Sequence, residues 1–229
     1  MEFTILLIFL VIMYLVLKFI FDYNIKKVKE IGENKQLDEL TQKYPENIEI
    51  CKEYLKKLNN ENVQIEEDKN SNATLYLVMS NKIFIANLKN SYTRIQTIAH
   101  ECLHSIQSKK MLWFNFIFSN VHLIYFLLIC ILGIAKVLSY KIIFLSILII
   151  GGFVFYAVRS YLENDAMIKA KFLAKEYMQE KNISTSEEID KIIKAYDKLN
   201  DIGIKCTNFK LLSNVFIKII IILVIFIIF

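Results

Sequence analysis

Four long apolar runs constrain the fold of this chain more than any other feature. In chain order they are Phe3–Phe21, Trp113–Val137, Lys141–Val158 and Leu211–Phe229. A helix that crosses a bilayer needs about 20 predominantly apolar residues, and each run is close to that length. Hydrophobic residues make up 55% of the 229 residues and the mean hydropathy is +0.39, which is too apolar for a soluble domain. We therefore expect a mainly α-helical membrane protein with about four transmembrane helices.

The apolar runs divide the chain into five expected regions. Residues 1–21 are expected to be a permanent transmembrane anchor, because the segment has neither the basic start nor the small-residue cleavage site of a signal peptide. Residues 113–158 are expected to form a transmembrane helical hairpin, and residues 211–229 a C-terminal transmembrane helix. The intervening regions, 22–112 and 159–210, contain about 140 residues, enough for one compact core.

The first intervening region reads as a small α+β domain. Leu37–Asn59 has helical periodicity that is interrupted at Pro45. Val63–Ile65 is a possible strand. Thr74–Met79 and Ile83–Leu88 are rich in β-formers and are separated by three polar residues, which predicts a β-hairpin.

Two further helices are predicted in the second intervening region. One runs from Arg159 to about Lys181. The next begins at a capping box, in which Ser184 or Thr185 precedes the acidic pair 187–188, and runs to about Asn200.

A helix predicted over Tyr92–Gln107 carries the residues with the clearest chemical meaning. Its apolar positions follow a single stripe, which consists of Ile95, Ile98, Ala99, Cys102, Leu103 and Ile106. His100 and His104 lie one turn apart on another face, with Glu101 beside them. The alternative interpretation is an amphipathic helix whose polar residues face water and whose His pair is a coincidence. Cys102 lies on the apolar stripe, so we interpret it as a core residue and not as a ligand.

Two imidazoles at this spacing can bind one Zn²⁺, and Glu101 can then act on a water molecule at the metal as a general base. The motif that takes a third His from the same segment is excluded, because Gln107 and Lys110 occupy the positions that it needs. A Glu from a later helix is the other common third ligand, and Glu163 is the candidate. Two His and one Glu leave the fourth position open, as in catalytic zinc sites. The alternative is that Glu163 is an ordinary surface acid.

The order of the apolar runs agrees with a shared site. Two runs separate His104 from Glu163, so the chain leaves and returns to one side of the membrane. Basic residues gather near the span ends on that side: Lys26, Lys27, Lys29, Lys109, Lys110, Arg159, Lys205 and Lys210. The opposite side has only Lys136 and Lys141. The positive-inside rule therefore predicts a cytoplasmic site. The net charge of +5 reflects these lysines and gives no indication of nucleic-acid binding.

Several of these features together resemble the bacterial membrane-embedded neutral zinc metallopeptidases, a gluzincin-like family. They are the hairpin run Thr74–Leu88, the segment Thr97–Gln107, the following pair of spans, the motif Glu163–Ala166 and the C-terminal span. The plan is also similar to the CAAX-prenyl and heat-shock-type membrane endopeptidases. The resemblance implies a zincin-like cytoplasmic domain, one zinc ion per chain held by His100, His104 and Glu163, and Glu101 as the catalytic residue. It also implies a multi-pass protein of the bacterial inner membrane.

The chain departs from the family at two positions. Leu103 occupies a position that is often Gly, and Met167 occupies one that is often Ser or Asp. If an acid at the latter position orients a ligand His, Asp165 or another group must replace it here.

The expected function is zinc-dependent hydrolysis of peptide bonds in membrane-proximal proteins or peptides. Nothing in the sequence selects an oxyanion donor among Tyr156, Arg159, Tyr161 and Tyr177. The alternative function is that of a non-catalytic zinc-binding membrane scaffold that recruits partner proteins. Two ionisable residues fall inside apolar runs: we interpret His122 as a hydrogen-bonded packing residue and Lys218 as a side chain that extends toward the headgroups.

Overall fold

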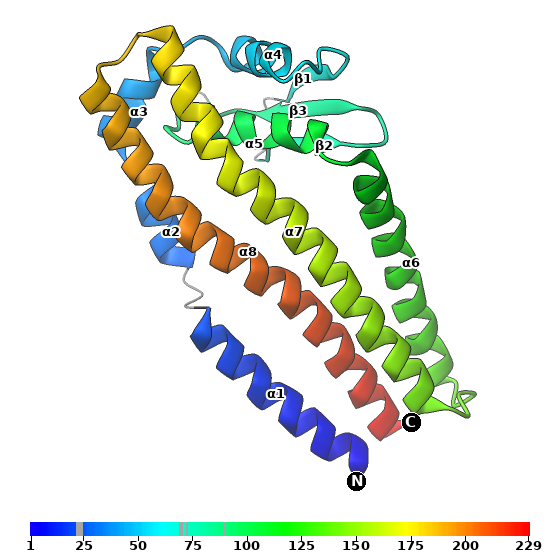
Figure 1. Ribbon diagram of the computed structural model, residues 1–229. Helices are drawn as coiled ribbons and strands as arrows, with labels where there is room; N and C mark the ends of the chain where they lie inside the picture. Colours follow the sequence, from blue (N-terminus) through cyan, green and yellow to red (C-terminus); the bar gives the residue numbers. More distant parts are fainter. Residues whose placement is uncertain (22–24, 69–70, 72, 89) are drawn as a thin grey trace. The chain divides into compact units, whose positions relative to one another are not determined.

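A computed structural model describes the chain except for residues 22–24, 69–70, 72 and 89, and without the side chains of Ile25 and Lys29 (Figure 1). The expected start of the first soluble region at Asp22 therefore lies outside the described residues, as does the side chain of the flanking Lys29. The described part is mainly helical and contains one small sheet. It separates into two compact units, each built from segments that are distant in sequence.

Unit 1 consists of Met1–Tyr23, Trp113–Tyr161 and Lys205–Phe229. Its helices are α1 (Glu2–Ile20), most of α6 (Lys109–Ile134), the first half of α7 (Lys141–Lys181) and the second half of α8 (Ser186–Ile228). Among the described residues these four helices are long and apolar enough to cross a membrane, judged by length and composition. The prediction of four such helices is confirmed.

Small residues bring the helices of unit 1 close together. A Cβ atom on Gly152 would lie only 2.5 Å from Cγ1 of Val215, so α7 and α8 touch at this point. On the preceding residue, Gly151, a Cβ atom would lie 3.0 Å from the ring of His122. That ring donates a hydrogen bond from Nε2 to the carbonyl oxygen of Leu148 at 3.1 Å, so His122 is the packing residue that was predicted.

Unit 2 consists of Asn24–Leu112 and Leu162–Ile204. It begins with α2 (Ile25–Gly32), which the sequence did not predict, followed by α3 (Lys35–Gln42) and α4 (Asn47–Lys57). The predicted break at Pro45 is confirmed, since α3 ends before it and α4 begins after it. The buried Arg94 stabilises this break, because its guanidinium donates to the carbonyl oxygens of Thr41, Tyr44 and Pro45 and to Oδ1 of Asn47.

The sheet of unit 2 contains β1 (Gln64–Asp68), β2 (Leu75–Leu77) and β3 (Lys82–Ala86) in the spatial order β1-β3-β2. Strands β2 and β3 are antiparallel, with Tyr76 opposite Ile83, so the predicted hairpin is confirmed. Strand β1 pairs in parallel with β3, which the sequence did not predict. Ile83 and Ile85 are fully buried and attach one face of the sheet to the core.

Helices α7 and α8 are longer than predicted. The helix expected to begin at Arg159 is the continuation of α7 from Lys141, and the helix expected to end near Asn200 continues in α8 to Ile228 (Figure 1). No proline interrupts either segment, and helical backbone groups bond within the helix whatever surrounds it. The start of α8 was predicted correctly: Thr185 N–H donates to Oε2 of Glu188 at 2.8 Å, and Glu188 N–H donates to Oγ1 of Thr185 at 3.2 Å.

Candidate metal site

Helix α5 (Arg94–Ile106) supplies most of the candidate site, and its buried stripe fixes its orientation. Ile95, Ile98, Ala99 and Cys102 are completely buried, and Leu103 is nearly so. The predicted stripe is therefore confirmed up to Leu103, whereas Ile106 is 46% exposed at the end of the helix and does not join it. Cys102 contacts Cys51 of α4, with their sulfur atoms 3.6 Å apart, and lies in the core as expected.

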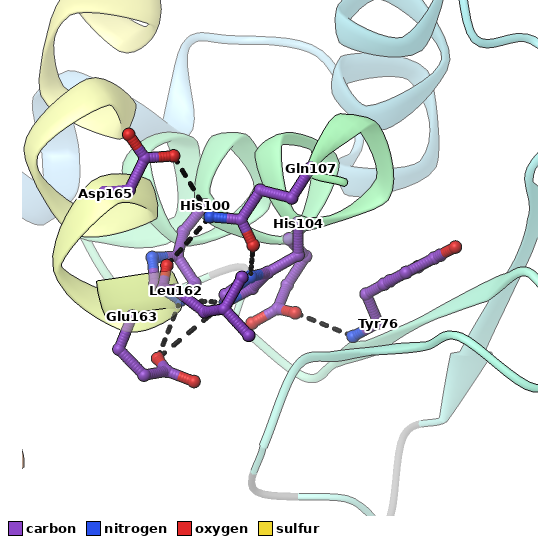
Figure 2. Close-up of polar contacts among 8 residues, drawn as sticks. Tyr76, His100, His104, Gln107, Leu162, Glu163 and Asp165 are labelled. Carbon is purple, nitrogen blue, oxygen red and sulfur yellow. Dashed lines mark hydrogen bonds and ion pairs between the residues drawn. The ribbon is translucent and has the colours of Figure 1, made fainter. Parts of the chain in front are cut away.

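With that stripe buried, His100 and His104 project toward Glu163 of α7 (Figure 2). The two Nε2 atoms lie 3.0 Å apart, and their rings are nearly perpendicular. Oε2 of Glu163 lies 3.5 Å from Nε2 of His100 and 3.7 Å from Nε2 of His104. The three residues that the sequence predicted as ligands thus form one cluster that can hold a metal ion.

The spacing of the three atoms fits a small tetrahedral ion. A tetrahedral Zn²⁺ with ligand bonds of about 2.0–2.1 Å separates its ligand atoms by roughly 3.4 Å. The separations of 3.0, 3.5 and 3.7 Å lie on both sides of this value. Two imidazole nitrogens and one carboxylate oxygen are also a donor set that suits zinc. The residues present therefore fit a divalent metal ion.

Glu101 lies on the helix between the two histidines and is 92% buried. Its Oε2 accepts a hydrogen bond from the backbone N–H of Tyr76 in β2, at 2.7 Å (Figure 2). Burial raises the pKa of the Glu101 carboxyl above its ordinary value, and the nearby imidazoles and the Tyr76 N–H only partly oppose that rise. A carboxylate held in this way is primed to accept a proton.

His104 is also buried, and its two ring nitrogens face different partners. Nε2 faces His100 and Glu163, whereas Nδ1 lies 2.8 Å from Oε1 of Gln107. Burial alone would lower the pKa of His104, but the nearby carboxylates of Glu163 and Glu101 outweigh it and raise the pKa. The site therefore attracts positive charge at the point where the three ligand atoms meet.

Gln107 connects this cluster to α7, and sequence reasoning missed that role. Its Nε2 donates to the carbonyl oxygen of Leu162 at 2.8 Å and to Oδ2 of Asp165 at 3.1 Å. Asp165, which the sequence offered as one possible group to orient a ligand histidine, is connected to His104 through Gln107. The available signal was the spacing of three residues between His104 and Gln107, which brings the two side chains close together at the end of α5, where Gln107 is the cap residue.

Tyr177, one of the four predicted oxyanion donors, does not belong to the site. It is 97% buried and packs against Tyr54 and Tyr44 in the core of unit 2. Tyr177 is buried because its large aromatic ring gains more from packing in the apolar core than from exposure at the site. The other three candidates, Tyr156, Arg159 and Tyr161, belong to unit 1.

No protein-family model, curated protein or solved structure matches this chain.

Proposed function

We propose that this protein is a zinc-dependent membrane metalloendopeptidase of the gluzincin-like type, with a zincin-like domain in unit 2. The observation that carries the proposal is the convergence of His100, His104 and Glu163 within 4.8 Å of one another, with Glu101 on the same helical turn. The four candidate membrane helices support the assignment to a membrane. The lysine distribution favours a site on the cytoplasmic side of the membrane, and the resemblance to the bacterial metallopeptidases suggests the bacterial inner membrane.

His100, His104 and Glu163 would hold one zinc ion per chain. When bound, a zinc ion polarises a peptide carbonyl and lowers the pKa of a water molecule toward 7. Three protein ligands leave a tetrahedral position for substrate or water, which is the arrangement of catalytic zinc sites.

Glu101 would act as the general base. Tyr76 N–H anchors Oε2, which leaves Oε1 to accept a proton from the attacking water and return it to the leaving amine. Because burial raises the pKa of Glu101, its carboxylate is a stronger base than an exposed one, which suits this exchange near neutral pH.

A polypeptide near the membrane is the substrate that we propose. Strand β2 lies at the edge of the sheet, and Tyr76, in its centre, contacts Glu101. An extended peptide can add to such an edge by main-chain hydrogen bonds. Glu163 also lies on the same unbroken helix as the apolar run Lys141–Val158, five residues beyond its end. Peptide bonds close to a membrane surface are therefore the proposed target.

Two variants separate this function from that of a zinc-binding scaffold. We expect purified wild-type protein to contain about one zinc per chain and to cleave a fluorogenic peptide library. Glu101→Gln should keep the zinc and lower the cleavage rate by about 10²- to 10⁴-fold, because only the base is lost. Glu163→Ala should lose both zinc and cleavage. Glu180→Gln, which changes an exposed acid that pairs with Lys57, is the matched control and should keep both.

The measurements are bound metal by mass spectrometry and cleavage rate for the same preparations. Zinc retained without any cleavage by the wild type would favour the scaffold. Equal cleavage by wild type and Glu101→Gln would contradict the proposed base, since a contaminating protease gives that result.

A further inference from the structure

The amide of Gln107 has only one orientation that satisfies its neighbours. Its two neighbours on α7, the carbonyl oxygen of Leu162 and the carboxylate of Asp165, are both hydrogen-bond acceptors. The amide nitrogen must therefore face α7, because it is the only end of the side chain that donates. The amide oxygen then faces Nδ1 of His104, at 2.8 Å (Figure 2).

This orientation decides where the proton of His104 resides. An amide oxygen only accepts hydrogen bonds, so Nδ1 of His104 must donate and must carry a hydrogen. In the neutral ring Nε2 then has the lone pair. Nε2 is the atom that lies 3.0 Å from Nε2 of His100 and 3.7 Å from Oε2 of Glu163.

We propose that Gln107 is a positioning residue that holds His104 in the Nδ1–H tautomer and so presents the Nε2 lone pair to a metal ion. Through Leu162 and Asp165 the same side chain also fixes α7 beside the histidine. Glu163 lies between these two contacts, one residue after Leu162 and two residues before Asp165. This inference rests on the proposed metal site. It adds a residue that does not itself bind the metal.

The ion pair between Asp165 and Lys169 supports the arrangement. Oδ1 of Asp165 lies 2.6 Å from Nζ of Lys169, while Oδ2 accepts from Gln107. One oxygen of the carboxylate thus binds a cation and the other binds the amide. The chain His104–Gln107–Asp165–Lys169 alternates donor and acceptor without a conflict at any step.

The tautomer can be measured directly because the chain has only three histidines. Selective ¹⁵N-histidine labelling of the full chain in detergent, without metal and at a pH where the rings are neutral, gives three imidazoles to resolve. His122 is an internal reference of the opposite kind, since its Nε2 donates to a carbonyl and must carry the hydrogen. A His104→Gln variant assigns the signals of His104. We expect wild-type His104 to be Nδ1–H.

Gln107→Met removes all three hydrogen bonds of the amide at nearly constant side-chain length, and Gln96→Met is the matched control. Gln96 is a buried amide on α5 whose Nε2 donates to Oδ1 of Asn200. Gln107→Met should populate the Nε2–H tautomer of His104 and weaken zinc affinity by about 10- to 100-fold in chelator competition. Gln96→Met should change neither quantity. Gln107→Glu keeps an oxygen for Nδ1–H and should restore the Nδ1–H tautomer.

The outcomes distinguish this inference from the function on which it rests. His104 remaining fully Nδ1–H in Gln107→Met, or an equal loss of zinc affinity in Gln96→Met, would overturn the positioning role. A protein that never cleaves peptides, but whose His104 tautomer and zinc affinity follow residue 107, would overturn only the peptidase.

Discussion

The backbone N–H of Tyr76 donates to Oε2 of Glu101 across 2.7 Å, which connects the edge strand of the sheet to the helix of the two histidines. Because the donor belongs to the backbone, most substitutions at residue 76 leave it in place. The contact therefore holds the proposed base in a position that the side chain at residue 76 does not determine.

Tyr76→Pro removes this donor and should slow peptide cleavage. Proline is tolerated in an edge strand where the missing N–H points away from the sheet, as it does here. A hydrogen bond to a charged group contributes about 1.5–3 kcal/mol, so we expect kcat/KM to fall roughly 10- to 100-fold with zinc content unchanged. Tyr76→Ala loses the same side chain but keeps the N–H, and it should cleave much faster than Tyr76→Pro. Equal rates for the two variants would show that the contact has no catalytic role.

Metal removal should lower the thermal stability of unit 2. An ion that binds only the folded chain stabilises it by about 2.7 kcal/mol when its free concentration is 100 times Kd. We expect chelator-treated protein to unfold at a lower temperature than zinc-loaded protein, as measured by scanning fluorimetry in detergent. Glu163→Ala should abolish the difference, because one of three ligands is lost. His122→Gln should preserve it, because that histidine bonds to Leu148 and not to the cluster. A zinc effect that survives in Glu163→Ala would place the binding site elsewhere.

The capping box of α8 gives a pH-dependent contribution to stability. The N–H of Thr185, followed by Lys43, lowers the pKa of Glu188 below its ordinary value. A carboxyl whose pKa is lower in the folded than in the unfolded chain stabilises the fold when the pH is above its pKa in the unfolded chain. That stabilisation is lost as the pH falls through its pKa in the folded chain. Glu188→Ala should therefore lower the unfolding temperature at pH 7, and the gap to wild type should shrink below about pH 4. The control Glu187→Ala changes the adjacent acid. A gap that stays constant down to pH 3 would contradict the role of the charge.

Local patterns in the sequence were enough to predict the elements that form the candidate site. The apolar stripe of α5 and the short polar turn between β2 and β3 are decided by neighbours along the chain. The pairing of β1 with β3 is not decided by neighbours along the chain, because two parallel strands are joined by a long connection that no local signal describes. Strand β1 also contains Glu66, Glu67 and Asp68, which are weak strand formers. Its partner offsets this, since Glu66 pairs with Lys82 of β3 at 2.9 Å.

The lengths of α7 and α8 were underestimated for a related reason. Hydropathy changes near Arg159 and again near Leu211, and we expected a separate helix on each side of those changes. Helical hydrogen bonds form within the backbone and do not depend on the change in hydropathy. Even Gly203 lies inside α8, at a position where a Cβ atom would lie 2.9 Å from Met167. The role of Gln107 was missed because, in the sequence alone, this residue only rules out the motif that takes a third His from the same segment. Its acceptors at Leu162 and Asp165 come from a segment that is brought close by folding.

Unit 2 is assembled from two stretches, Asn24–Leu112 and Leu162–Ile204, and the ligand cluster draws its histidines from the first and its carboxylate from the second. Synthesis proceeds from the N-terminus, so a nascent chain has both imidazoles long before Glu163 is made. During that interval only two of the three donors exist. Completion of the cluster is thus delayed until the apolar hairpin between the two stretches has been translated, and a prematurely terminated chain lacks a full set of ligands.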